Sequence, residues 1–112
     1  MADPAALYDE ADRLKTDGDL EGAAAKLEAA LAADESYALA HSALAVVRQK
    51  LGQHEEAIEH AKRVTELEPN DAFSFTALSV TYQRAYAGTG DTGYIQQAED
   101  AMARSRQIEA GG

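Results

Sequence analysis

Apolar and polar residues follow one another along the chain with the spacing of amphipathic helices. Positions that recur at intervals of three and four residues lie on one side of a helix. In the third predicted helix this stripe consists of His41, Leu44, Ala45 and Arg48. We expect the methylenes of Arg48 to pack there while its guanidinium reaches solvent. The pattern predicts six helices, at residues 4–17, 20–34, 37–51, 54–68, 71–87 and 94–109.

Turn-forming residues stand where the predicted helices end. Glycine readily adopts the left-handed conformation that terminates a helix, so Gly18 and Gly52 mark two helix ends. Asp19 and Asp71 precede the next helices and can accept hydrogen bonds from their first amide groups. Pro69 prevents the fourth helix from continuing. The helices are therefore joined by short turns.

The sequence repeats itself at a fixed interval. Gly52 follows Gly18 by 34 residues, and Ala57 follows Ala23 by the same distance. A third copy begins at Ala72. A period of this length is typical of arrays of stacked helix pairs. We therefore predict one domain over residues 1–112, built from three repeats at about 4–37, 38–71 and 72–112.

The third repeat is longer than the other two. If Ala98 is the counterpart of Ala57, the interval is 41 residues instead of 34, which adds seven residues near positions 87–93. The addition lengthens the first helix of this repeat, its loop, or both. The same stretch, GTGDTG, fits the dinucleotide-binding pattern G-x-G-x-x-G. That pattern follows a strand, whereas a helix precedes it here, and Asp91 would repel phosphate, so we expect a flexible loop.

The repeated positions resemble the tetratricopeptide repeat family. The middle repeat matches at Leu44, Ala45, Gly52, Ala57, Leu67 and Pro69. The first repeat departs at Glu10, where a large apolar residue is usual, and at Glu35, where proline is usual. The resemblance covers nearly the whole chain. It implies an all-α fold: an α-solenoid of three antiparallel helix pairs, wound as a right-handed superhelix.

We expect the last helix to cap the array. Terminal repeats need a polar outer face for solubility. The residues expected to face inward are Ile95, Ala98, Met102 and Ile108. Those expected to face water are Gln97, Asp100, Arg104 and Gln107. The array would then stand without a further helix, and residues 110–112 would form a frayed tail.

A second stripe lies on the opposite side of each first helix, where the family resemblance implies a concave groove. Its apolar members, Leu39, Val46, Phe73 and Val80, would form a continuous strip. The whole predicted groove consists of Tyr8, Asp12, Lys15, Leu39, Ser42, Val46, Gln49, Lys50, Phe73, Thr76, Val80, Gln83 and Arg84. An apolar strip with no evident reason to face water indicates a binding surface.

The groove predicts a non-enzymatic module that binds a peptide or helix segment of a partner protein. The alternative is a self-association or structural scaffold module in which the groove or its ends form a homo-oligomer interface. The strip could also pack within the chain, against the last helix. Some relatives clamp a partner's terminal carboxylate with Lys and Asn, but Tyr8 and Asp12 stand at those positions. An acidic Asp12 argues against such a clamp.

Charge and composition narrow the range of partners. The net charge is −10, and residues 1–36 hold ten acidic against three basic residues. This acidity disfavours nucleic acid; it either steers a basic partner toward the first repeat or only keeps the chain soluble. No apolar run is long enough for a membrane span. The start lacks a secretory signal, and cysteine is absent, so we expect a cytoplasmic protein.

No group of residues has the spacing of a catalytic or metal site. His54 and His60 are six residues apart, on different sides of a helix, whereas a zinc pair needs a spacing of four. We interpret both as solvated side chains, with Glu56 and His60 an ordinary helical pair. An open helical array also offers no closed pocket that excludes water. We expect no catalytic residues, no metal and no cofactor.

Overall fold

The computed structural model describes residues 3–111, and these form six helices joined by short connections. The helices are α1 (Pro4–Thr16), α2 (Leu20–Ala33), α3 (Ala38–Lys50), α4 (His54–Leu67), α5 (Ala72–Thr89) and α6 (Gly93–Glu109). Each bound lies within two residues of its predicted position. The described residues contain no strand, so the all-α prediction is confirmed.

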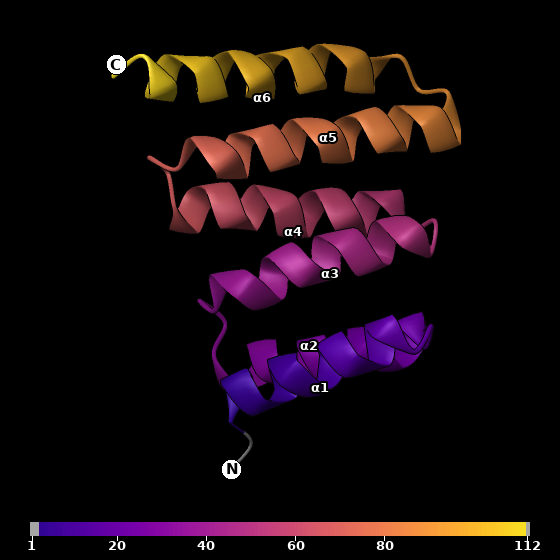
Figure 1. The fold of residues 1–112 in the computed structure, drawn as a ribbon. Helices are drawn as coiled ribbons and strands as arrows, with labels where there is room; N and C mark the ends of the chain where they lie inside the picture. The colour runs from indigo at the N-terminus through magenta and orange to yellow at the C-terminus, as the bar shows by residue number, and fades with distance from the viewer. Residues whose placement is uncertain (1–2, 112) are drawn as a thin grey trace.

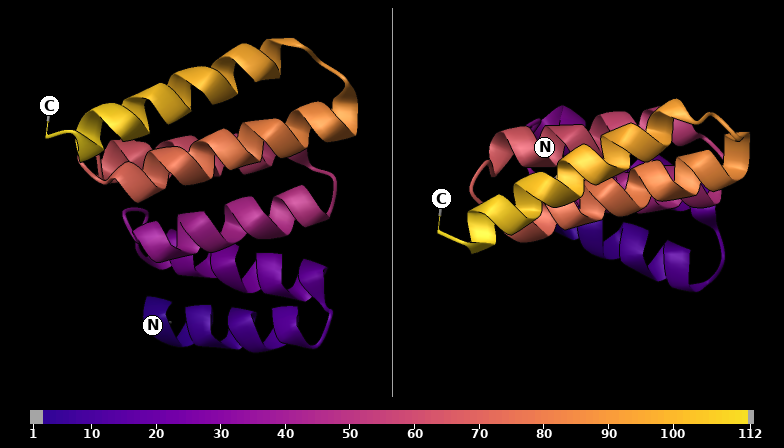
Figure 2. Two further views of the ribbon diagram at one scale, coloured as in Figure 1. Left: turned by 45° about the horizontal axis from the view of Figure 1, so that its top comes forward. Right: turned by 90° about the horizontal axis from the view of Figure 1, so that it is seen from above.

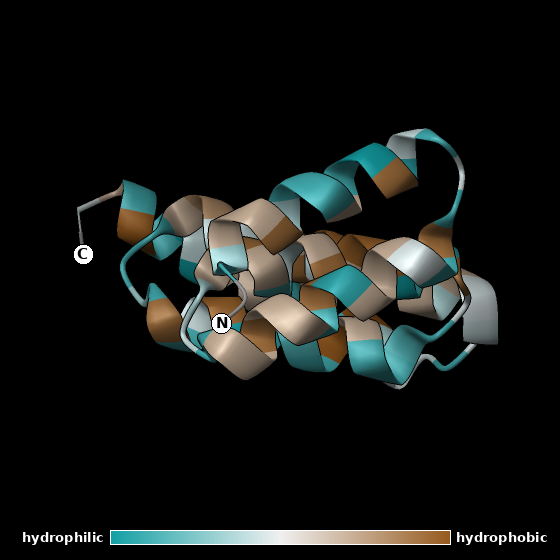
Figure 3. Ribbon diagram, turned by 90° about the horizontal axis from the view of Figure 1, so that it is seen from below, coloured by the Kyte–Doolittle hydropathy of each residue, from teal (hydrophilic) through white to brown (hydrophobic). Residues whose placement is uncertain are grey.

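The helices stack as an array of antiparallel pairs (Figures 1 and 2). Consecutive helices pack together along the whole chain, and first helices also contact one another, α1 with α3 and α3 with α5. The described chain measures 40 × 33 × 20 Å. In the view from the α1 end, hydrophilic and hydrophobic residues alternate around the helices (Figure 3), as expected when one side packs and the other faces water. This is the predicted α-solenoid.

Helix ends use the turn chemistry that the sequence predicts. Asp19 accepts a hydrogen bond from the Gly22 amide at 2.9 Å, and Asp71 accepts one from the Phe73 amide at 3.1 Å. Gly18 and Gly52 have φ angles of 89° and 78°. These caps satisfy backbone groups that a helix leaves unpaired at its ends.

Two clusters of buried side chains hold the array together. The first joins α1, α2 and α3 around Leu27 and Leu44. The second joins α3, α4, α5 and α6 around Leu78 and Tyr82. Alanine fills much of both clusters, which lets helix backbones approach closely. The two clusters meet in α3, whose opposite sides contribute to each.

The third repeat is lengthened in its helices. α5 has 18 residues against 13 in α3, and α6 has 17 against 14 in α4. The connection at 90–92 is as short as the one at 51–53. The expected loop over GTGDTG is therefore wrong for half of the motif, since Gly88, Thr89 and Gly93 are helical. Gly88 and Thr89 end α5, and the left-handed Gly90, with φ 75°, stops it.

The last helix departs from its expected inward face. Ala98 is buried, and Met102 and Ile108 are half-buried, but Ile95 is 40% exposed. The expectation that Ile95 faces inward is therefore wrong, because no helix of the described residues covers this side of α6. In the expected tail, α6 ends at Glu109, and Gly112 lies outside the described residues.

Candidate binding groove

A hollow of about 370 Å³ lies between α3 and α5, on the side of the array where the groove was expected. Ala61 and Val64 of α4 contribute to its wall. The predicted groove residues that line it are Ser42, Val46, Gln49, Phe73, Thr76, Val80 and Arg84. The structure therefore brings together the α3 and α5 members of the predicted stripe, with the exception of Leu39, Lys50 and Gln83.

Large apolar side chains in this hollow face solvent. Phe73 is 76% exposed, Val46 is 43% and Val80 is 38%. They lie on the side of α3 and α5 that faces away from the buried Leu44 and Leu78. Both helices thus carry apolar residues on two sides, and core packing accounts for only one of them.

The α1 members of the predicted groove border a separate, much smaller space. Tyr8, Asp12 and Lys15 line a hollow of about 20 Å³ between α1 and α3. The Tyr8 ring packs edge-on against Tyr37, with ring centres 6.2 Å apart. The side chains that line this space, Tyr8 and Lys15 among them, leave little of it empty. The predicted continuous strip is therefore interrupted between α1 and α3.

Three further predicted residues lie outside the α3–α5 hollow. Leu39 is 54% exposed and Lys50 is exposed, but neither lines a hollow between the helices. Gln83 lines a different hollow, between α5 and α6, and donates a hydrogen bond to the Ser79 hydroxyl at 3.2 Å. The open part of the predicted groove is thus confined to α3 and α5.

One positive charge stands at the rim of the α3–α5 hollow. Arg84 is exposed and lines it. Between residues 3 and 111, no hydrogen bond or ion pair engages its guanidinium. A guanidinium in this setting can pair with a carboxylate in two-point geometry. The hollow therefore offers an apolar surface beside a free cation.

Sequence reasoning missed the contribution of α4 to this hollow. Ala61 and Val64 lie on a second helix, and the prediction considered first helices only. Ala61 and Val64 follow Ala57 by one and two helical turns, on the side toward the next repeat. This spacing could have indicated that they border the hollow.

Away from the hollow, the structure overturns the interpretation of His54 and His60 as solvated, since both are half-buried. His41 is buried and its Nδ1 lies 3.0 Å from Nδ1 of His60. His54 is half-buried with its Nδ1 unpaired within residues 3–111. His60 also approaches Glu28 at 3.8 Å, so it does not form the expected pair with Glu56. Burial lowers the pKa of His60, and the neighbouring His41 lowers it further.

Ion pairs between repeats lie on the same side as the histidines. The Arg63 guanidinium donates to both carboxylate oxygens of Glu35, at 2.8 and 2.9 Å. These bonds hold the pKa of Glu35 below its ordinary value. Arg48 donates to Gln53 at 2.7 Å and to Glu28 at 3.2 Å. The guanidinium, which was expected to extend into solvent, is instead held by a carboxylate that α2 places opposite it.

Comparison with known proteins decides the family. A sequence profile described as Tetratricopeptide repeat matches residues 14–78, more than half of the chain. The chain belongs to the tetratricopeptide repeat family. No sequence among curated proteins matches it significantly.

Solved structures share the fold of this tetratricopeptide repeat chain. Two crystal structures of MamA superimpose with TM-scores of 0.83 and 0.81, at 19% and 21% identity, over 97% and 96% of this chain. A thermophilic tetratricopeptide repeat protein of Thermus thermophilus, TTC0263, gives 0.78 at 23% identity over 94%. The chain spans 60%, 55% and 56% of those three chains. At such identities the likeness shows the fold alone.

Tetratricopeptide repeats are general protein–protein interaction modules, and the family consists generally of non-enzymatic scaffolds. None of the helices described between residues 3 and 111 is long and apolar enough to cross a membrane. The family thus supplies the class of function.

Proposed function

We propose that this chain is a non-enzymatic interaction module whose α3–α5 hollow binds a short segment of a partner protein. The observation that carries the proposal is the exposure of Val46, Phe73 and Val80 around a hollow of about 370 Å³. Burying such apolar surface against a partner removes it from water, which favours association.

The hollow favours a segment with one or two apolar anchors. An apolar side chain would insert between Val46 and Val80, and Phe73 would cover it. Arg84 at the rim would pair with a carboxylate of the segment and set its direction. Because the space between α1 and α3 is narrow, the bound segment is short, and its affinity is in the micromolar range, roughly −7 to −8 kcal/mol.

The acidic first repeat extends the proposal to basic flanking residues. Residues 1–36 carry ten acids against three bases, and Asp12 lies on the side of α1 that faces α3. Basic residues that flank the anchors would be attracted to this repeat and would accelerate the encounter.

A peptide-display library selected against the purified chain supplies probes for this surface. Peptides that bind the wild type should bind the double variant Val46→Asp, Phe73→Asp at least about tenfold more weakly, a loss of about 1.4 kcal/mol or more. The control is Leu39→Asp, which places one such charge on an exposed apolar position outside the hollow. Helical content by circular dichroism should be the same in all three proteins.

Binding of the selected peptides that is unchanged in the double variant would reject the α3–α5 hollow as the binding surface. Binding that Leu39→Asp weakens as strongly as the double variant would shift the surface toward the amino end of α3.

A further inference from the structure

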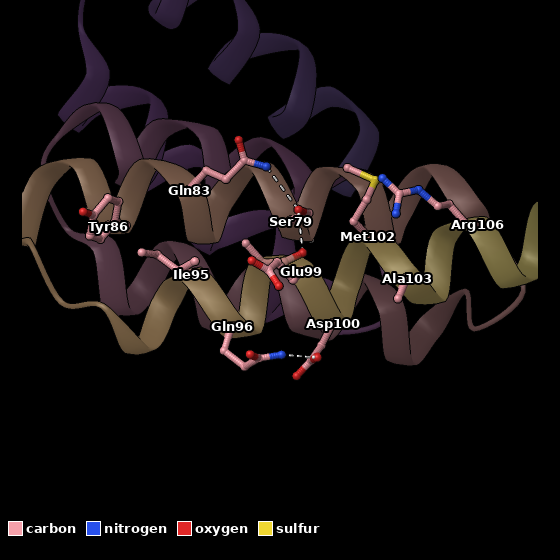
Figure 4. A pocket seen from close by; sticks show the side chains of 11 residues that line it. Ser79, Gln83, Tyr86, Ile95, Gln96, Glu99, Asp100, Met102, Ala103 and Arg106 are labelled. Atoms are coloured by element: carbon pink, nitrogen blue, oxygen red, sulfur yellow. Dashed lines mark hydrogen bonds between the residues drawn. The ribbon is translucent and has the colours of Figure 1, made fainter.

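The last helix pair leaves open a face that the earlier pairs have covered. α3 packs on the pair α1 and α2, and α5 packs on the pair α3 and α4. On the corresponding side of α5 and α6 lies a hollow of about 840 Å³, which no helix of residues 3–111 fills (Figure 4). Tyr86 and Ile95, which are 39% and 40% exposed, line one end of it. Tyr86 lies in the part of α5 that extends beyond the counterpart of α3.

The floor of this hollow already satisfies its polar groups. The Ser79 hydroxyl donates to the Ala98 carbonyl at 2.8 Å and accepts a hydrogen bond from Gln83 at 3.2 Å. Gln96 donates to Asp100 at 2.9 Å. These pairs are drawn in Figure 4. A molecule that binds here therefore needs to supply few hydrogen bonds to the base of the hollow. Its recognition depends on the apolar surface and on the charges at the edge of the hollow.

Along the hollow, α6 presents one stripe of four residues at i, i+3, i+4 and i+7. They are Glu99, Met102, Ala103 and Arg106. Glu99 and Arg106 are exposed, and neither forms an ion pair within the described residues. The midpoint between the two charges falls between Met102 and Ala103. The stripe is thus acidic on one side of its centre and basic on the other.

We propose that a second copy of this chain docks on the α5–α6 face, with the two α6 helices antiparallel about a two-fold axis near Met102 and Ala103. A two-fold axis pairs residue i with residue j and j with i. It places Glu99 of each copy beside Arg106 of the other, which forms two ion pairs. Ala103 lets the helices approach at the axis, and the flexible Met102 fills the remaining space.

Open-ended stacking of copies is opposed by charge. Within the chain, α3 packs on the pair α1 and α2. In a head-to-tail stack, α1 of the next copy would pack in the same way on the pair α5 and α6. The α1 residues at the positions of Ala43, Leu44 and Leu51 are Asp9, Glu10 and Asp17. Arg13 stands at the position of Val47, so this side of α1 carries three acids against one base, a net charge of −2, and would be repelled by Glu99 and Asp100. The two-fold arrangement matches opposite charges, so a closed dimer is favoured over a filament.

The dimer contact is limited to one helix face and the adjoining end of α5 in each copy. The 17 residues of α6 span about 25 Å. An interface of this size is typical of reversible association. We therefore expect a monomer–dimer equilibrium that shifts with protein concentration in the micromolar range.

Sedimentation equilibrium of charge-swapped variants tests the pairing. Glu99→Arg alone, or Arg106→Glu alone, places like charges together and should weaken the dimer at least tenfold relative to the wild type. The double variant Glu99→Arg, Arg106→Glu restores opposite charges across the axis and should restore the dimer. Glu59→Arg and Lys62→Glu on α4 make the same changes in net charge away from this face, and both should dimerise as the wild type does.

Three results would overturn the proposal: a wild type that is monomeric at every concentration, single variants that dimerise normally, or a double variant that fails to recover. A monomeric wild type would mean that the face is covered by a helix of another protein or is left open. The groove variant Val46→Asp, Phe73→Asp should dimerise normally. The experiment therefore tests the dimer independently of peptide binding in the α3–α5 hollow.

Discussion

At the scale of single residues, the contact between His41 and His60 fixes the protons on both rings. His41 Nε2 lies 2.8 Å from the Glu35 carbonyl, which can only accept, so this nitrogen donates. In a neutral ring His41 Nδ1 is then an acceptor, and His60 Nδ1 donates to it across 3.0 Å. The pair links α3 to α4 and requires that Nδ1 of His41 carry no proton.

The burial of His60 makes stability dependent on pH. The pKa of His60 is lowered from 6.5, chiefly by burial and then by His41. As the pH falls below about 6.5, the unfolded chain binds this proton before the folded chain does, so the free energy of unfolding decreases. We expect this loss in urea unfolding between about pH 7.5 and pH 5.5, a window above the titration of ordinary carboxylates. Glu28, at 3.8 Å, partly offsets the loss because it favours the proton on His60.

The variant His60→Gln isolates the source of this pH dependence. It keeps a polar side chain near His41 but removes the group that titrates. Its free energy of unfolding should therefore change less over the same pH interval than that of the wild type. Equal changes in the two proteins would assign the pH dependence to other groups.

At the scale of the helices, a left-handed glycine ends α3. Gly52 has φ 78°, and a Cβ added there would meet nothing within 4 Å. Any cost of a side chain at this position is therefore conformational. We expect Gly52→Ala to lower the free energy of unfolding by about 1–2 kcal/mol. Gly52→Asn should cost less, because asparagine tolerates this conformation; equal losses in the two variants would contradict the explanation.

The helices could be predicted from the sequence because periodicity and turn chemistry are local. The end of α5 was misplaced because GTGDTG offers three glycines, and local sequence does not say which one ends the helix. The structure uses Gly90. Gly88 remains helical, with the His54 ring so close that an added Cβ would collide with it. That contact joins residues far apart in the sequence.

The binding surface was less predictable because it depends on how side chains fill the space between helices. The family resemblance implied which side of each first helix would line a groove. It gave no information on how much of the space between neighbouring first helices stays open, and side chains leave a hollow beside Val46 but little beside Tyr8. The contact of His41 with His60 had no signal either, because the residues lie 19 positions apart on different helices.

At the scale of the whole molecule, the two buried clusters predict that the array opens in parts. Stability in a repeat array is approximately a sum over repeats and the contacts between neighbours. Leu27 belongs to the cluster of α1, α2 and α3, whereas Leu78 belongs to the cluster of α3 to α6. Loss of one leucine therefore weakens one end of the array more directly than the other.

Hydrogen exchange of two matched variants measures this separation. Leu27 and Leu78 are 1% and 7% exposed, so each change to alanine should cost about 2–5 kcal/mol. In Leu27→Ala, the amides of α1 and α2 should lose protection while those of α5 and α6 keep most of theirs. Leu78→Ala should give the opposite pattern, with α3 affected in both variants because it contributes to both clusters. A uniform loss across all six helices in either variant would show instead that the array unfolds as one cooperative unit, with α3 coupling the two clusters too strongly for either to open alone.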